Sequence, residues 1–226
     1  MSRSNIRDRL AKLTPEQQGA LAARIQQSGL VKRDHGIPRR PTDVPVEMSF
    51  AQQRLWFMQQ LQPENPFYNM PIPLRLTGRL DVGALQACLD ALVSRHETLR
   101  TTFEALGESA VQVISSPGPV KLAVADLSGL PESSREAEAR RLVEEEGLRP
   151  FDLSTGPLMR ARLLRLSAED HVLQLTMHHI ISDGWSLPVL YRDIGELYQA
   201  ACSGEAARLP ALAIQYADFS VWQRNW

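Results

Sequence analysis

The sequence predicts an α/β (α+β) fold in which a mixed β-sheet is flanked by helices and preceded by a helical leader. Segments with alternating apolar and polar side chains, such as residues 158–166, interleave with segments whose apolar side chains recur at helical spacing, such as residues 187–201. The 226 residues include 43% hydrophobic and 23% charged side chains, as in an ordinary globular protein. This length suits one large domain or two small ones.

Residues 1–45 are predicted to form a helical leader and a proline-rich linker, ahead of a main domain at residues 46–226. Thr14 is the expected N-cap of a leader helix, with a proline directly after it and Gly29 just beyond its end. Residues 31–45 are basic and rich in proline, which predicts a semi-extended linker with a solvated charge. The leader either packs on its own domain or docks with another protein.

The first part of the main domain is predicted to run helix, strand, helix. Ser49 is expected to cap a helix that continues to about residue 61. Residues 72–78 alternate like a strand, and Asp81 begins a second helix that leads to Arg95 and His96. The side chains expected to face inward are Ala51, Leu55, Met58 and Leu61 in the first helix and Leu85, Leu89 and Leu92 in the second.

The next part is predicted to contain two short strands, a charged helix and a hairpin. Residues 111–114 and 122–124 are the expected strands, and residues 131–147 the helix, whose many charges should be solvated. The strand at residues 158–166 is expected to pair with the following strand across a turn at residues 167–170.

The chemistry is concentrated in residues 172–186, which read as a strand that enters a turn and then a helix ending near Gly204. Side chains alternate along a strand, so His178 and His179 should point to opposite faces. A histidine at the end of a buried strand is suited to proton transfer, because its ordinary pKa of about 6.5 lies near working pH. A histidine pair on an apolar strand is nevertheless more often structural than catalytic.

Several other chemistries are disfavoured. Neighbouring histidines that diverge can hardly chelate one metal ion, and no third ligand stands at a usual spacing. There is no Gly-x-Ser-x-Gly elbow, and Ser182 and Ser186 flank a turn without an evident oxyanion loop. The net charge of -1 argues against general nucleic-acid binding. Two cysteines without a pattern, and no apolar run long enough for a bilayer, predict a soluble cytoplasmic protein.

Four ordered motifs resemble those of a known family. Residues 178–186 (HHIISDGWS) resemble the His-His-x-x-x-Asp-Gly signature of nonribosomal peptide synthetase condensation domains, whose fold is related to chloramphenicol acetyltransferase. Residues 48–57 (MSFAQQRLWF), 95–103 (RHETLRTTF) and 216–223 (YADFSVWQ) resemble the first, second and fourth core motifs. The resemblance covers residues 46–226 and implies a chloramphenicol acetyltransferase-like lobe.

The resemblance implies amide-bond formation between a donor acyl or peptidyl group and an acceptor aminoacyl group, each tethered to a carrier protein. A complete domain is similar to two such lobes in a V, so this sequence is expected to supply the N-terminal lobe and to have little or no turnover alone. Residues 184–186 and the motif around Tyr216 are most similar to domains that join an L-configured donor.

The same resemblance implies the cofactors and partners. No metal or bound cofactor is expected, because phosphopantetheine is delivered on the carrier-protein substrates. The expected partners are donor and acceptor carrier proteins, the C-terminal lobe of the domain and, through residues 1–30, an upstream synthase subunit.

The resemblance also assigns roles to individual residues. His179 is the expected catalytic residue, either as the general base toward the attacking amine or as the group that positions the amine and stabilises the tetrahedral intermediate. His178 is expected to hold the loop through a ring hydrogen bond, and Gly184 to let the backbone pass close to the reacting centre. Asp183 is expected to pair with Arg95, or otherwise with Arg100, and so to aim His179. The candidates for lining the substrate channel are Trp185, Ser186, Ser49 and Gln52.

Two other classes of protein remain as alternatives. A stand-alone acyltransferase that uses coenzyme A would share the histidine motif, but it does not explain the first and fourth motifs. A noncatalytic carrier-protein docking or scaffold module would make use of the leader instead.

Overall fold

The computed structural model describes residues 14, 36–41, 45–107 and 109–226. The chain divides into two compact units, Met1–Ile37 and Pro38–Trp226. The predicted leader helices fall in the first unit, and apart from Thr14 they lie outside the described residues. The second unit therefore holds all of the secondary structure considered below.

The helices and strands follow the predicted order closely. Within the described residues they are β1 (Val46–Glu47), α3 (Phe50–Leu61), η1 (Pro66–Tyr68), β2 (Asn69–Thr77), α4 (Val82–Arg95), η2 (Glu97–Arg100), β3 (Thr101–Leu106), β4 (Ser109–Ile114), β5 (Leu122–Asp126), α5 (Glu132–Leu148), β6 (Met159–Ser167), β7 (Asp170–His178), α6 (Leu187–Ser203) and α7 (Tyr216–Arg224). None of the described helices is both long enough and apolar enough to cross a bilayer.

The strands form two sheets. The larger has the order β2-β7-β6-β5 and is mixed, because β5 runs parallel to β6 while the other pairs are antiparallel. The predicted hairpin is confirmed by the β6–β7 ladder, in which Ser167 pairs with Asp170 across the turn. The smaller sheet has the order β1-β4-β3 and is antiparallel, and the sequence did not predict it as a separate sheet.

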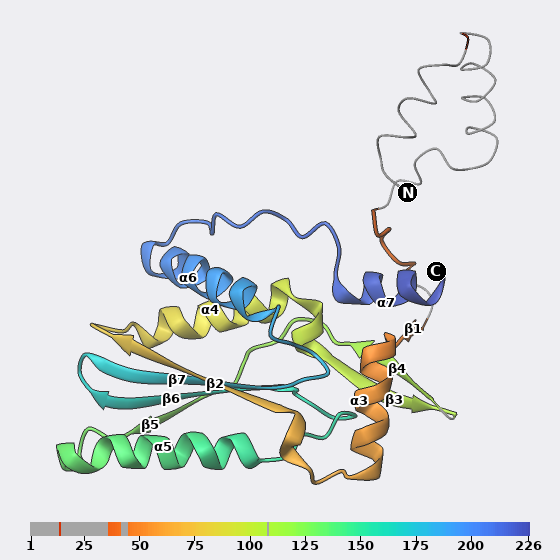
Figure 1. Cartoon of the computed structure of the whole chain (residues 1–226). Helices are drawn as coiled ribbons and strands as arrows, with labels where there is room; N and C mark the ends of the chain where they lie inside the picture. The colour runs from red at the N-terminus through yellow and green to blue at the C-terminus, as the bar shows by residue number, and fades with distance from the viewer. Residues whose placement is uncertain (1–13, 15–35, 42–44, 108) are drawn as a thin grey trace. The chain divides into compact units, whose positions relative to one another are not determined.

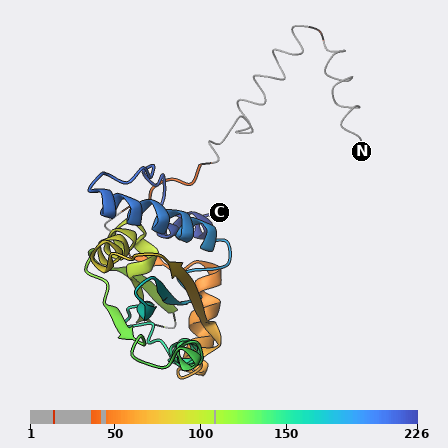
Figure 2. The same cartoon turned by 90° about the vertical axis from the view of Figure 1, so that its left-hand side faces the viewer.

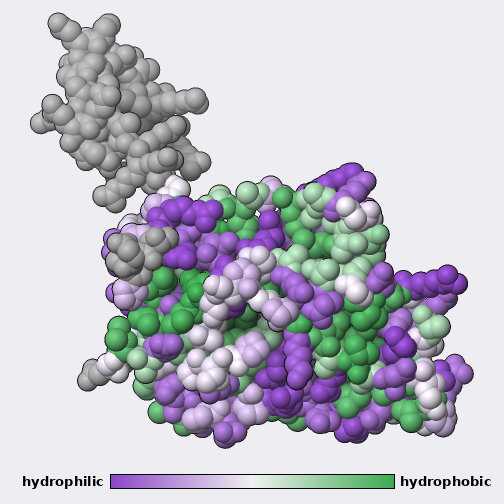
Figure 3. Space-filling model, turned by 180° about the vertical axis from the view of Figure 1, so that it is seen from behind, coloured by the Kyte–Doolittle hydropathy of each residue, from purple (hydrophilic) through white to green (hydrophobic). Residues whose placement is uncertain are grey.

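Helices cover both faces of the larger sheet. Helices α4 and α6 pack together over one face, and α5 lies along the other (Figures 1 and 2). Strand β7 lies between β2 and β6 and is buried from His171 to His178, on both faces. Its polar residues Gln174 and Thr176 are therefore as buried as its leucines. The rear of the molecule carries hydrophobic and hydrophilic side chains interspersed (Figure 3).

Strand β2 forms one edge of the larger sheet and contains Pro71 and Pro73. These prolines lie opposite Thr176 and Gln174 of β7. Proline has no N–H to give to a ladder, so it is tolerated where its nitrogen faces away from the partner strand. The two prolines are consistent with the edge position of β2.

Local signals placed the helix ends correctly. Ser49 and Gln52 form a capping box at the start of α3, and the Asp81 carboxylate accepts the backbone N–H of Ala84, at 2.9 Å, at the start of α4. Gly204 ends α6 with a φ of 70°, a left-handed conformation that glycine adopts without a steric penalty.

The inward face of α3 differs from the prediction. Leu55 is buried as expected, but Ala51, Met58 and Leu61 are exposed, and the helix buries Gln52 and Gln59 instead. The two amide side chains are needed inside because they donate hydrogen bonds to backbone carbonyls of neighbouring loops. Hydrophobicity alone therefore gave the wrong face.

Candidate active site

The two histidines lie where β7 ends and the chain turns sharply. The backbone N–H of His178 donates to the Leu158 carbonyl at 3.0 Å, and that of His179 donates to the Tyr68 carbonyl at 2.7 Å. The N–H of Ile181 closes the turn on the His178 carbonyl at 3.1 Å. Strands or loops on both sides thus fix the backbone that carries the signature.

His178 is a buried, neutral side chain. It is 1% exposed, and its ring packs against Tyr68 and Phe151 with centroid distances of 6.2 and 6.0 Å. Its Nδ1 accepts the backbone N–H of Ile180 at 3.1 Å, which is the ring hydrogen bond expected from the sequence. In the neutral ring the hydrogen must then sit on Nε2, which has no hydrogen-bond partner among the described residues. Burial, and to a smaller degree the neighbouring His179, lowers the pKa of His178 to about 4.

His179 has the opposite environment. Its side chain is exposed, and within the described part of the chain its ring makes no hydrogen bond. The two rings therefore lie in different environments, because β7 is buried on both faces and ends at His178, whereas His179 lies in the turn that follows. An exposed ring on a fixed backbone is free to bind a reacting group.

The predicted pairing of Asp183 with Arg95 is wrong. Asp183 is exposed, and its Oδ1 accepts the backbone N–H of Ser186 at 2.9 Å and the Ser186 hydroxyl at 2.6 Å. Arg95 instead donates from Nε to Oδ2 of Asp193 at 3.0 Å. The alternative partner, Arg100, donates to the carbonyl of Ser115.

Burial explains why Arg95 pairs with Asp193 rather than with Asp183. This carboxylate on α6 is fully buried and also contacts His96 at 2.8 Å and Arg192 at 2.7 Å. An unpaired carboxylate in that position would be very costly, whereas Asp183 is in contact with water. Burial by itself raises the pKa of Asp193, but the hydrogen bonds from Arg192, His96 and Arg95 outweigh it and hold the pKa below its ordinary value.

A double-mutant cycle checks this correction. Asp183→Ala should lower the free energy of unfolding by about 1 kcal/mol, because it removes the hydrogen bonds to Ser186, and Arg95→Ala should act independently. Their coupling free energy in urea unfolding is expected to stay below about 0.5 kcal/mol. A coupling well above that value would restore the pairing of Asp183 with Arg95.

The four channel candidates separate into two groups. Trp185 is 90% exposed, and Ser186 is half-buried and bonded to Asp183. Ser49 and Gln52 are 0% and 2% exposed, so in this chain they cannot line a channel. They are structural: Ser49 is hydrogen-bonded to the Tyr216 hydroxyl, and Gln52 donates to the Ile180 carbonyl in the signature turn.

No steric contact in the described chain requires a glycine at position 184. It is exposed, its φ is not in the left-handed region, and a Cβ placed there would meet no atom within 4 Å. Gly184→Ala should therefore change the free energy of unfolding by less than about 0.5 kcal/mol in a thermal or urea melt. A larger loss would mean that the glycine serves the fold rather than the approach of a ligand.

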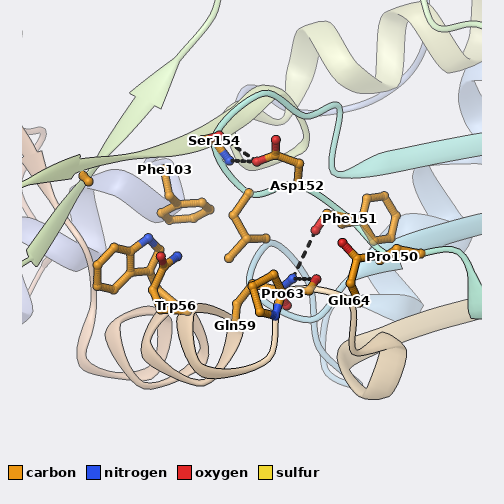
Figure 4. A pocket seen from close by; sticks show the side chains of 12 residues that line it. Trp56, Gln59, Pro63, Glu64, Phe103, Pro150, Phe151, Asp152 and Ser154 are labelled. Carbon is orange, nitrogen blue, oxygen red and sulfur yellow. Dashed lines mark hydrogen bonds between the residues drawn. The ribbon is translucent and has the colours of Figure 1, made fainter.

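A cavity of about 470 Å³ lies between α3, β3 and the loop at residues 150–154 (Figure 4), and neither histidine of the signature lines it. Trp56 and Phe103 line one side of it. Gln59 spans the other side and donates to the carbonyls of Pro63 at 2.6 Å and Phe151 at 3.2 Å. Because Phe151 also packs on His178, the cavity wall and the buried histidine share one aromatic ring.

Sequence reasoning did not identify Tyr68, Phe151 and Asp193 as part of this region. Tyr68 ends the short helix η1 and Phe151 lies in a loop, both far from the signature in sequence, so no local pattern could indicate them. No group of three or more histidine, cysteine or acidic side chains in the described residues could hold a metal ion.

Comparison with known proteins identifies the family of the chain. The family model described as "Condensation domain" matches residues 44–226. Phosphinothricin tripeptide synthetase PhsC of Streptomyces viridochromogenes is 46% identical over 222 residues, which is 98% of this chain but 20% of that protein.

Two solved structures have the same fold. The X-domain of teicoplanin biosynthesis, in complex with OxyB, is 34% identical with a TM-score of 0.72 and aligns with 84% of this chain and 40% of that chain. The first condensation domain of the calcium-dependent antibiotic synthetase, in complex with a substrate analogue, is 30% identical with a TM-score of 0.69. That match covers 75% of this chain and 41% of the other. The chain thus spans less than half the length of these relatives.

Proposed function

The chain belongs to the condensation-domain family of nonribosomal peptide synthetases, a family of peptide-bond-forming acyltransferases, and from this premise we propose that it presents the histidine used in amide-bond formation. The observation that carries the proposal is the contrast between the two histidines. His178 is buried and hydrogen-bonded to the backbone, whereas His179 is exposed with a free ring on a fixed turn. A group that receives or positions a proton needs this combination of access and rigidity.

In the proposed reaction, the amine of an acceptor aminoacyl group attacks the thioester carbon of a donor acyl group. A C–N bond forms, the C–S bond breaks, and the proton lost by the amine is finally carried by the phosphopantetheine thiol that leaves. His179 either accepts that proton or holds the amine in line and stabilises the tetrahedral intermediate. The substrates arrive on donor and acceptor carrier proteins.

We further propose that the donor has the L configuration. The support is the resemblance of residues 184–186 and of the motif around Tyr216 to domains of that type. A condensation assay with paired L- and D-aminoacyl donor carrier proteins tests it. The L-donor should give most of the product, and equal or greater use of the D-donor would reject the assignment.

A complementation assay tests the proposed role of this lobe. The chain is mixed with donor and acceptor aminoacyl carrier proteins, with and without a separately expressed C-terminal lobe, and dipeptide is measured by mass spectrometry. Product is expected only when both lobes are present. Dipeptide formed by this chain alone would contradict the proposal that the second lobe is required.

A docking function is the second candidate, because the X-domain that resembles this chain has been solved in complex with OxyB. In that case the chain should bind a carrier protein or another protein without any turnover. Deleting residues 1–30 distinguishes docking through the leader from docking through the rest of the chain. Binding that is lost with the deletion would assign it to the leader, and binding that persists would assign it to residues 31–226.

A further inference from the structure

The linker directly before the domain is bound to it by two arginines. Residues 31–45 were expected to carry solvated charge, and Arg39 agrees in part, since its side chain is 58% exposed and donates to the Leu212 carbonyl. Arg40 is different, because its side chain is 14% exposed. Its backbone N–H and its Nη1 both donate to Oδ1 of Asp218, at 3.2 and 2.9 Å. For Arg40, the expectation of a solvated charge is wrong.

Asp218, the partner of Arg40, is a buried carboxylate that accepts several hydrogen bonds. It lies in the first turn of α7, is 1% exposed, and also accepts the backbone N–H of Gln215 at 2.8 Å. Burial alone raises the pKa of Asp218, but the hydrogen bonds from Gln215 and Arg40 outweigh this and lower it. The carboxylate is therefore charged, and its nearest cationic partner is Arg40 at 2.9 Å, while Nη1 of Arg39 lies 3.6 Å from Oδ2.

Arg40 also reaches a second carboxylate. Its Nη2 lies 2.9 Å from Oε2 of Glu97, the first residue of η2. One guanidinium thus holds α7 and η2 together through two acidic side chains. Arginine is suited to this because its planar group presents several donors in fixed directions, whereas a lysine offers one compact charge.

The η2 helix in turn holds the catalytic turn. The hydroxyl of Thr98, the residue after Glu97, donates to the carbonyl of Ile181 at 3.0 Å. Ile181 is two residues from His179, and its own N–H closes the turn on His178. The route from the linker to the signature therefore consists of one ion pair, one peptide unit of η2 and one hydrogen bond.

We propose that Arg40 is a positioning residue, which couples the N-terminal linker to the turn that carries His179 through Glu97 and Thr98. Without its guanidinium, Asp218 and Glu97 lose their nearest cationic partner and keep only the longer contacts of Arg39 at 3.6 Å and Arg100 at 4.0 Å, so η2 loosens its hold on Ile181. The consequence for catalysis rests on the proposed function of His179. The coupling itself is a property of the fold and can be measured without turnover.

Hydrogen–deuterium exchange of the 226-residue chain tests the coupling. In Arg40→Ala, exchange of the peptide covering residues 178–186 should rise at least about threefold, while exchange of β6 stays unchanged. Arg39→Ala is the matched control, since it removes an exposed arginine that lies 3.6 Å from Asp218 but, within the described residues, makes no ion pair with Glu97, and it should leave residues 178–186 unchanged. Thr98→Val should loosen residues 178–186 in the same way while leaving the linker as in the parent.

The conservative variant and a spectroscopic signal complete the test. Arg40→Lys keeps one charge but cannot bridge both carboxylates, so it should restore part of the protection. The imidazole NMR signals of His179 should shift in Arg40→Ala and Thr98→Val, and not in Arg39→Ala. Faster exchange confined to residues 38–47 and α7, with residues 178–186 and His179 unaffected, would overturn the proposal. A loss of condensation without these changes would count against the coupling and leave the function of His179 intact.

Discussion

Replacing His179 by alanine is expected to reduce the rate of dipeptide formation by about 10²–10⁴-fold in a complete domain that contains this lobe. The reason is local: the substitution removes the one exposed imidazole of the signature and leaves the turn that carries it, because that turn is held by backbone hydrogen bonds to Tyr68 and Leu158. The measurement is single-turnover condensation with preloaded donor and acceptor carrier proteins.

The stability of the same variant is the control. Since His179 is exposed and its ring makes no hydrogen bond in the described chain, His179→Ala should change the free energy of unfolding by less than about 0.5 kcal/mol. Undiminished condensation by a folded His179→Ala variant would remove the residue from the mechanism.

The second large effect is a loss of stability in mild acid that originates from His178. In the unfolded chain a histidine titrates near pH 6.5, while burial lowers the pKa of His178 to about 4 in the folded state. Between these values the unfolded state binds more protons, so stability is complete above pH 6.5 and declines as the pH falls toward 4. The difference in pKa corresponds to about 3 kcal/mol.

His178→Asn isolates this contribution. The Asn side-chain oxygen can stand near the place of Nδ1 and accept the Ile180 N–H, but it does not titrate. Urea unfolding at a series of pH values should therefore show a much smaller decline for the variant than for the parent. The remainder should come from His171, whose pKa is also lowered, first by burial and then by Arg165, and from carboxyl groups such as Asp193 and Asp218, whose pKa the fold lowers. If His178→Asn loses the same free energy of unfolding as the parent over this range, His178 is not the group responsible.

Signals between residues that are neighbours in the sequence were enough to predict the elements that lie closest to the site. The Ser49 and Asp81 caps, the β6–β7 hairpin and the glycine after α6 each depend on neighbours in sequence, and the structure contains all of them. The opposite environments of the two histidines depend on where β7 ends, because His178 is its last residue and His179 lies in the turn that follows.

The incorrect predictions concern contacts between segments that are far apart in the sequence. Arg95 pairs with the carboxylate that the packing of α4 against α6 buries, which is that of Asp193. Asp183 and Asp193 both lie in or near the signature in the sequence, so no local pattern distinguishes them. The buried glutamines of α3 likewise depend on carbonyls supplied by loops more than 90 residues away. Hydrogen-bond satisfaction across the fold, rather than helical periodicity, decided both cases.

The two prolines of β2 affect whether neighbouring lobes can associate through the edges of their sheets. An edge strand with free N–H groups is a template on which another chain can add a strand, and this risk grows where similar domains are crowded together. Pro71 and Pro73 deprive the outer edge of β2 of donors at alternate positions while the inner edge stays paired with β7. The larger sheet therefore ends at β2, and neighbouring lobes are protected from joining edge to edge there.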